Sequence, residues 1–76
     1  MAANTFRLPL TFDGHTAHLE VTHLQNGAWL VYTAVDGRVI GWERFALRVQ
    51  VDRYRARMQQ WLALAEANER RLPAAA

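Results

Sequence analysis

The stretch from Ala28 to Phe45 reads Ala-Trp-Leu-Val-Tyr-Thr-Ala-Val, Asp36-Gly37, then Arg-Val-Ile-Gly-Trp-Glu-Arg-Phe. Two runs rich in β-branched and aromatic residues flank Asp36-Gly37, a dipeptide that readily adopts the positive φ angles of a tight hairpin turn. The first run is apolar on both of its alternating faces, so we expect each side of it to be covered. These residues predict a β-hairpin at the centre of the fold.

Two further turn dipeptides, Asp13-Gly14 and Asn26-Gly27, divide the residues before this hairpin. Each is flanked by runs rich in Thr, Val, Leu and aromatic residues, which is a strong hairpin signal. We therefore expect four strands joined by consecutive hairpins, an antiparallel meander, at about Thr5–Phe12, His15–Leu24, Ala28–Val35 and Arg38–Phe45.

If all three turns have two residues, the register and the two faces of the sheet follow. Face one would carry Phe6, Leu8, Leu10, Leu19, Val21, Leu30, Tyr32, Ala34 and Val39. Face two would carry Leu24, Trp29, Val31, Val35, Ile40 and Trp42, with Arg38 and Arg44 among them. A G1 bulge at Asp36-Gly37 would instead exchange the two faces of the last strand and leave Trp29 and Val31 on face two.

The second half of the chain has a helical period. One apolar stripe recurs at spacings of three and four residues, with Leu62 beside it: Leu47, Val51, Tyr54, Met58, Trp61 and Ala65. The helix should begin between Leu47 and Asp52 and extend over about 47–72, with a frayed tail at 73–76. The prediction is a single α+β domain over 1–76, in which a C-terminal helix packs on face one of the meander (ββββα).

The short length makes the predicted core marginal. A chain of this size buries about 60% of the surface that its unfolded form exposes, and it has no cysteine to form a disulfide or a thiolate zinc site. An oligomer interface or a bound partner would supply the missing stabilisation. No apolar run is long enough to span a bilayer and no signal-peptide core is present, so we expect a cytoplasmic protein.

All nine basic residues are arginine. This composition suits forked recognition of phosphate or carboxylate, and it equally fits the codon usage of a GC-rich bacterial or phage genome. The net charge of +2 is too small to imply a polyanionic partner. On the helix, Arg48 and Arg55 should flank one side of the apolar stripe and Arg53 and Arg57 the other, as a solvated basic rim does.

Chemistry-bearing residues are sparse. His15, His18 and His23 cannot share a metal ion, because His18 faces away and the other two would be about 26 Å apart along an extended strand. The chain has neither Cys nor Ser, and no paired carboxylates or glycine-rich phosphate loop. We therefore expect no enzymatic activity, no metal and no cofactor.

The best candidate site is the group of aromatic, aliphatic and arginine side chains predicted on face two: Trp29, Val31, Ile40, Trp42, Arg38 and Arg44. Such residues are favoured at protein–protein hot spots, and they can also stack single-stranded bases. The occupant could be a partner protein, a second copy of the chain or, less favoured, a single-stranded nucleic acid.

The segment Val35-Asp36-Gly37-Arg38-Val39-Ile40-Gly41, followed by Glu43-Arg44-Phe45 and a helix, resembles two groups of proteins. One consists of short uncharacterised bacterial proteins with a hairpin-then-helix unit. The other is a family of small phage anti-CRISPR inhibitors of type I surveillance complexes. The resemblance implies a non-enzymatic binding protein of phage or mobile-element type that occludes a partner. The alternative is a single-stranded nucleic-acid-binding homodimer that uses face two.

Overall fold

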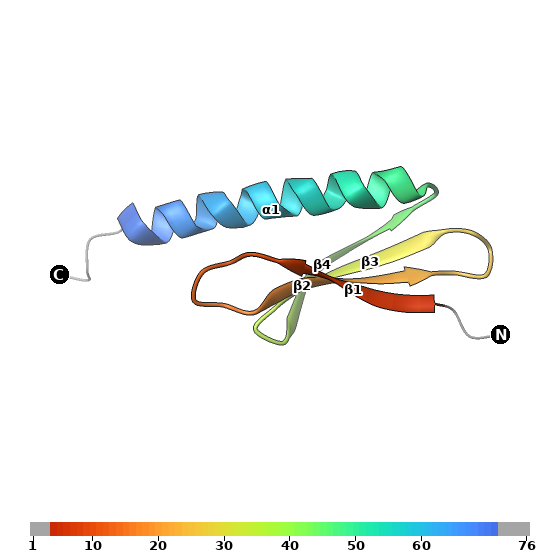
Figure 1. Ribbon diagram of the computed structural model, residues 1–76, viewed down its shortest axis with the longest axis horizontal. Helices are drawn as coiled ribbons and strands as arrows, with labels where there is room; N and C mark the ends of the chain where they lie inside the picture. The colour runs from red at the N-terminus through yellow and green to blue at the C-terminus, as the bar shows by residue number, and fades with distance from the viewer. Residues whose placement is uncertain (1–3, 72–76) are drawn as a thin grey trace.

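The computed structural model describes residues 4–71, and it has the predicted ββββα order (Figure 1). Its elements are β1 (Asn4–Leu10), β2 (Ala17–His23), β3 (Trp29–Val35), β4 (Arg38–Phe45) and α1 (Arg48–Arg71). The strands form one antiparallel sheet in the order β1-β2-β3-β4, which confirms the α+β meander. The tail predicted at 73–76 lies outside the described residues.

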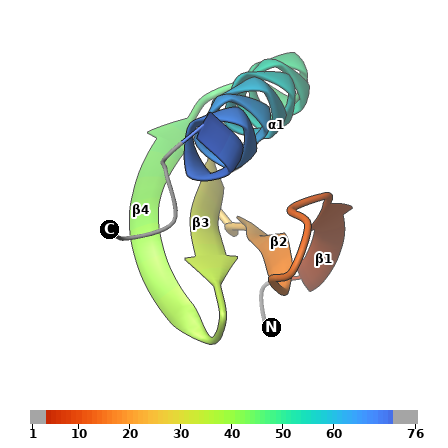
Figure 2. The same ribbon diagram turned by 90° about the vertical axis from the view of Figure 1, so that its left-hand side faces the viewer.

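Helix α1 lies over one side of the twisted sheet, above the region between β4 and β1 (Figure 2). Within residues 4–71, no helix or strand lies over the other side of the sheet in either view (Figures 1 and 2). Over residues 4–71, α1 lacks the continuous apolar stretch that a membrane-crossing helix needs.

Two of the three hairpin turns form as predicted. The amide of His15 donates to the carbonyl of Phe12 over 2.9 Å, which closes a two-residue turn at Asp13-Gly14. At the third turn the φ angles of Asp36 and Gly37 are 52° and 80°, the two successive left-handed residues of a type I′ hairpin. Because the first turn has two residues, β1 pairs with β2 in the predicted register, with Leu8 opposite Leu19.

The second turn is one residue longer than predicted, so the predicted faces of β3 are wrong. The amide of Leu24 donates to the carbonyl of Ala28 over 2.8 Å, which leaves a three-residue loop that ends in Gly27 at φ 89°. A three-residue loop with glycine in this conformation is a common hairpin connection. Val21 therefore lies opposite Val31 rather than Tyr32. Because side chains alternate along a strand, this one-residue shift turns every side chain of β3 over.

A bulge changes the faces of β4 as well. Val39 pairs with Ala34 and Gly41 pairs with Thr33, so Ile40 is an extra residue on β4. The bulge lies inside the hairpin and not at Asp36-Gly37, where the alternative register had placed it. From Gly41 onward it exchanges the two faces of β4, and Trp42 comes to lie opposite Tyr32.

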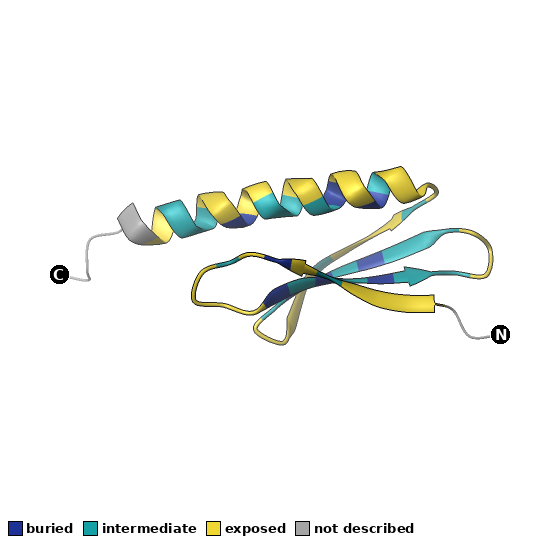
Figure 3. Ribbon diagram, viewed as in Figure 1, coloured by how far each residue is buried: buried dark blue, intermediate teal, exposed yellow. Residues whose placement is uncertain are grey.

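The core lies between α1 and the face that carries Leu19, Val21 and Val31, all fully buried (Figure 3). The helix contributes Val51, Tyr54, Met58 and Leu62 to it. Assigning Leu47 and Trp61 to the core stripe was wrong, because their exposed fractions are 59% and 54%. At 100° per residue, Trp61 lies about 80° around the helix from Val51, whereas Leu62 lies almost directly above it.

Helix α1 begins at Arg48, inside the predicted interval, and a glutamine caps it. The side-chain oxygen of Gln50 accepts hydrogen bonds from the amides of Ala46 (3.1 Å) and Leu47 (2.9 Å). This is the glutamine half of a capping box, in which the third helical residue binds an otherwise unpaired amide at the helix start. Asp52 is thus one turn inside the helix, where it pairs with Arg48 over 3.0 Å.

Candidate functional site

The structure separates the six residues predicted as one binding site. Trp29 and Val31 lie on the face that α1 covers, and Val31 has no exposed surface. Trp42 lies on the opposite face, across from Tyr32, and 63% of its surface is exposed. Val31 is therefore a core residue and cannot reach a partner, whereas Trp42 can.

Trp29 belongs to an aromatic cluster at the end of the molecule where α1 begins. The rings of His23 and Trp29 are stacked, with centroids 3.9 Å apart, and Phe6 meets Trp29 edge-on at 6.5 Å. The guanidinium of Arg48 lies 5.5 Å from the centroids of both Phe6 and Trp29, within the range of cation–π attraction. Arg48 and Trp29 therefore hold the start of the helix against β1 and β3, which gives both of them a structural role.

An uncovered apolar surface remains on β3 and β4. We call it the open face, and it comprises Leu30, Tyr32, Val39, Trp42 and Arg44. Tyr32 lies opposite Trp42, and Leu30 lies opposite Arg44. The sequence interpretation missed Leu30 and Tyr32 because it placed them on the covered face. Their position follows from the three-residue loop that ends in Gly27. In the sequence, however, this loop cannot be distinguished from a two-residue Asn-Gly turn.

The half of this sheet surface contributed by β1 and β2 is polar instead. Arg7 lies opposite Glu20, a favourable cross-strand pair. The hydroxyls of Thr5 and Thr22 lie 3.1 Å apart, within hydrogen-bonding distance. The apolar character of the uncovered side is thus concentrated on β3 and β4.

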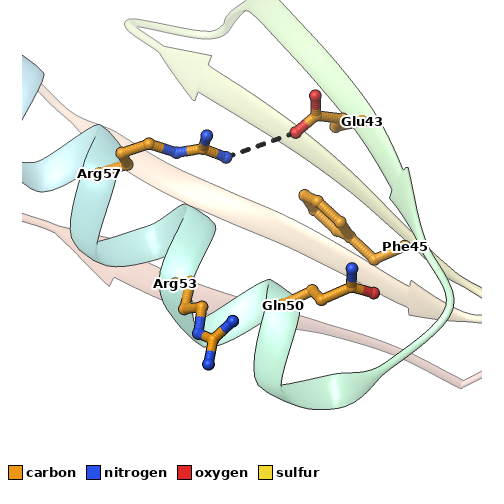
Figure 4. Close-up of a pocket in the computed structure, with 5 residues that line it drawn as sticks. All are labelled: Glu43, Phe45, Gln50, Arg53 and Arg57. Atoms are coloured by element: carbon orange, nitrogen blue, oxygen red, sulfur yellow. Dashed lines mark ion pairs between the residues drawn. The ribbon is translucent and has the colours of Figure 1, made fainter.

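A cleft of about 530 Å³ lies between β4 and the first half of α1 (Figure 4). It is open to solvent and is lined by Glu43, Phe45, Gln50, Arg53 and Arg57. The guanidinium of Arg57 and the carboxylate of Glu43 point toward each other across it, 3.7 Å apart. The cleft and the open face lie on opposite sides of β4, because the neighbouring residues Glu43 and Arg44 point to opposite faces of the strand.

The helical arginines divide between two sides, as predicted. On one side, Arg55 donates to the carbonyl of Pro9 on β1 over 2.8 Å. On the other side, Arg53 and Arg57 line the cleft next to β4. Because the charges are split in this way, α1 does not present one basic stripe to a nucleic-acid backbone.

His15 joins three parts of the fold. Its Nδ1 donates to the carboxylate of Asp36 in the third turn over 2.6 Å, and its Nε2 lies 3.8 Å from Glu69 on α1. Its ring also stacks on Phe12, with centroids 4.2 Å apart. The hydrogen bond to Asp36 raises the pKa of His15 above its ordinary value, and the same bond lowers the pKa of Asp36.

The histidines do not converge. His15 pairs with Asp36, His18 lies between Pro9 and Ala34, and His23 stacks on Trp29. Within residues 4–69, whose side chains the structure describes, no three His, Cys, Asp or Glu residues come together as a metal-binding group.

Comparison with known proteins gives this chain no relative. No protein-family model matches it, and no curated protein or solved structure is significantly similar to it. The functional proposal therefore depends on the geometry of the open face and of the cleft on the other side of β4.

Proposed function

We propose that this chain is a non-enzymatic, cytoplasmic binding protein that docks on a partner protein through its open face. The observation that carries the proposal is the exposure of Trp42 beside Tyr32, on a sheet surface that α1 does not cover. Burying such a surface in a complex would also add the apolar contact that a domain of this size lacks.

The residue types of the open face favour a protein partner. Tyr, Trp and Arg are the residues most enriched among the few that dominate interface energies. Here Trp42, Tyr32 and Arg44 lie on two adjacent strands, where the sheet backbone holds them rigidly. A rigid aromatic anchor loses little conformational entropy on binding, which increases the net affinity per contact.

The polar groups inside the molecule have structural partners, which supports binding over catalysis. Thr33 and Tyr54 bind each other in the core, and on the surface His15 and Asp36 bind each other. Among the described residues, no buried side-chain nitrogen or oxygen lacks a hydrogen-bond partner. The His15–Asp36 pair has shifted pKa values, as catalytic groups often do, but it is exposed and links the first hairpin to the third turn.

We further propose that the mode of action is occlusion of the partner, as in the phage inhibitors that the hairpin segment resembles. Occlusion requires a rigid, complementary surface and no reactive group. Trp42 and its neighbours Val39 and Ile40 on β4 provide an exposed apolar segment for such a surface.

Site-specific photocrosslinking in the native host tests this function. A photoreactive phenylalanine analogue at position 42 should form one dominant adduct, and the same analogue at the exposed helix position Gln60 should not. The captured protein, once purified, should bind the wild-type chain and lose at least about 2 kcal/mol of binding free energy with Trp42→Ala. Equal crosslinking from both positions would contradict the proposal.

A second candidate function is the binding of single-stranded nucleic acid. Tyr32 and Trp42 are cross-strand neighbours with Arg44 close by, and sheet aromatics flanked by arginine can stack bases. A homodimer could present two such surfaces to one strand. Fluorescence titration with a mixed-sequence oligonucleotide of about 20 nucleotides would then show saturable quenching that weakens with salt and is lost in Trp42→Ala. The partner-protein proposal predicts no response at physiological salt.

A further inference from the structure

The two edges of the sheet differ in the contacts that they make with the rest of the chain. At the β1 edge, Pro9 has no amide hydrogen, and its carbonyl accepts a hydrogen bond from Arg55 over 2.8 Å. Directly after β1, Gln59 binds both the amide (2.8 Å) and the carbonyl (2.7 Å) of Thr11. These contacts occupy the sheet edge at the C-terminal end of β1, where another strand could not pair.

The opposite edge is formed by β4, whose one strand neighbour within residues 4–71 is β3. Unpaired backbone groups on an edge strand can pair with another chain. The bulge at Ile40 distorts the first part of β4, which leaves Gly41–Phe45 in regular pairing with β3. This segment of five residues spans about 17 Å, enough for a short added strand.

Positive charge predominates along this edge. Strand β4 carries Arg38 and Arg44, and the adjoining cleft adds Arg53 and Arg57 from α1. The same two groups of residues contain one carboxylate, that of Glu43. Arg57 lies 3.7 Å from Glu43 in an exposed pair, so a second carboxylate could approach its guanidinium from the cleft.

We propose that the partner adds an extended, acidic segment to the free edge of β4, antiparallel or parallel to Gly41–Phe45. Main-chain hydrogen bonds to β4 would supply affinity, and carboxylates of the segment would meet Arg53 and Arg57 across the cleft. This inference rests on the proposed function and specifies the chemistry of the partner. Charge argues against a second copy as the occupant, because two β4 edges would bring together strands with an excess of arginine.

Model peptides test the inference directly. The probe is an acetylated and amidated peptide of alternating Glu and Val, about eight residues long, which matches the span of an edge strand. Binding is measured by titration against the isotopically labelled chain, together with amide hydrogen exchange. We expect chemical-shift changes and slowed exchange centred on Gly41–Phe45. A Lys-Val peptide and a Glu-Val peptide methylated on alternate backbone nitrogens should each bind at least about tenfold more weakly.

Matched variants test the role of the arginines. Arg53→Gln and Arg57→Gln should each weaken the Glu-Val peptide by about two- to fivefold, and raising the salt concentration should reduce the difference. Arg7→Gln is the control, because Arg7 is an exposed arginine on the far edge strand, and it should leave the affinity unchanged. Arg57 pairs with Glu43 at an exposed site, so its substitution should not unfold the chain.

Three outcomes would overturn the inference. The first is that no peptide binds, and the second is that the N-methylated peptide binds as well as the unmodified one. The third is slowed exchange of the β4 amides in the free chain together with a dimer in sedimentation, which would identify a second copy at the edge. In each case, specific crosslinking from position 42 would still support the proposed function, so the two failures are distinguishable.

Discussion

The hydroxyl of Tyr54 on α1 lies 2.9 Å from the hydroxyl of Thr33 on β3, and both side chains are buried. This hydrogen bond connects the helix to the sheet in the middle of the core. Thr33 lies opposite Gly41, next to the bulge at Ile40, and the hydroxyl of Tyr54 is also the nearest atom above Gly41. The pair therefore fixes where the helix lies on the sheet.

Removing one member of this pair should be costly. Tyr54→Phe leaves the buried Thr33 hydroxyl without its partner, and we expect a loss of about 1–3 kcal/mol in the free energy of unfolding, measured by urea denaturation. The double variant Tyr54→Phe/Thr33→Val removes both polar groups and should recover part of that loss. A neutral Tyr54→Phe would show that the hydrogen bond does not hold the core.

The two adjacent helix residues Trp61 and Leu62 should respond in opposite ways to truncation. Leu62 is fully buried, so Leu62→Ala should cost about 2–5 kcal/mol. Trp61 is more than half exposed, so Trp61→Ala should cost less than about 1 kcal/mol, close to the exposed control Gln60→Ala. Thermal and urea midpoints of the three variants measure this. A larger effect at Trp61 than at Leu62 would contradict the observed helix orientation.

Trp29 and Trp42 should also differ, because the register puts them on opposite faces. Trp29 packs against His23, Phe6 and Arg48, and we expect Trp29→Ala to cost on the order of 2 kcal/mol of stability. Trp42→Ala should leave stability almost unchanged. Acrylamide quenching of variants that keep a single tryptophan should show Trp42 to be the more accessible of the two. If Trp29 were the more accessible of the two, the result would instead support the two-residue second turn that the sequence predicted.

Stability should depend on pH through His15 and Asp36. The pKa of His15 is raised. The stability that His15 contributes to the fold is therefore complete below the ordinary histidine pKa of 6.5, and it is lost as the pH rises through the raised pKa. The pKa of Asp36 is lowered. The stability that Asp36 contributes to the fold is therefore complete above the ordinary aspartate pKa of 3.8, and it is lost as the pH falls through the lowered pKa. The pair should therefore contribute most between these two values.

An NMR titration of the His15 ring measures the first of these shifts, and Asp36→Asn should return the pKa of His15 toward its ordinary value. The stability difference between wild type and His15→Asn should be larger at pH 5 than at pH 9, because His15 is charged only at the lower pH. A His15 pKa at or below 6.5 would contradict the observed pairing with Asp36.

Local sequence was sufficient for the order and kind of the elements. Asp13-Gly14 and Asp36-Gly37 each form the tight turn that their φ preferences favour, and so the pairing of β1 with β2 follows the predicted register. The helix start was predictable within a few residues, as was the division of its arginines between two sides. All of these features depend on residues close together along the chain.

The composition of the open face was decided only by the tertiary structure. Strand β3 is apolar on both of its alternating faces, so its pattern could not indicate which side α1 covers. Asn26-Gly27 is compatible with a two-residue or a three-residue loop, and the choice inverts every side chain of β3. Packing of Val31 and Thr33 under the helix selects the longer loop. The bulge at Ile40 then places Trp42 beside Tyr32 on the uncovered side, because an extra residue exchanges the faces of the strand that follows it.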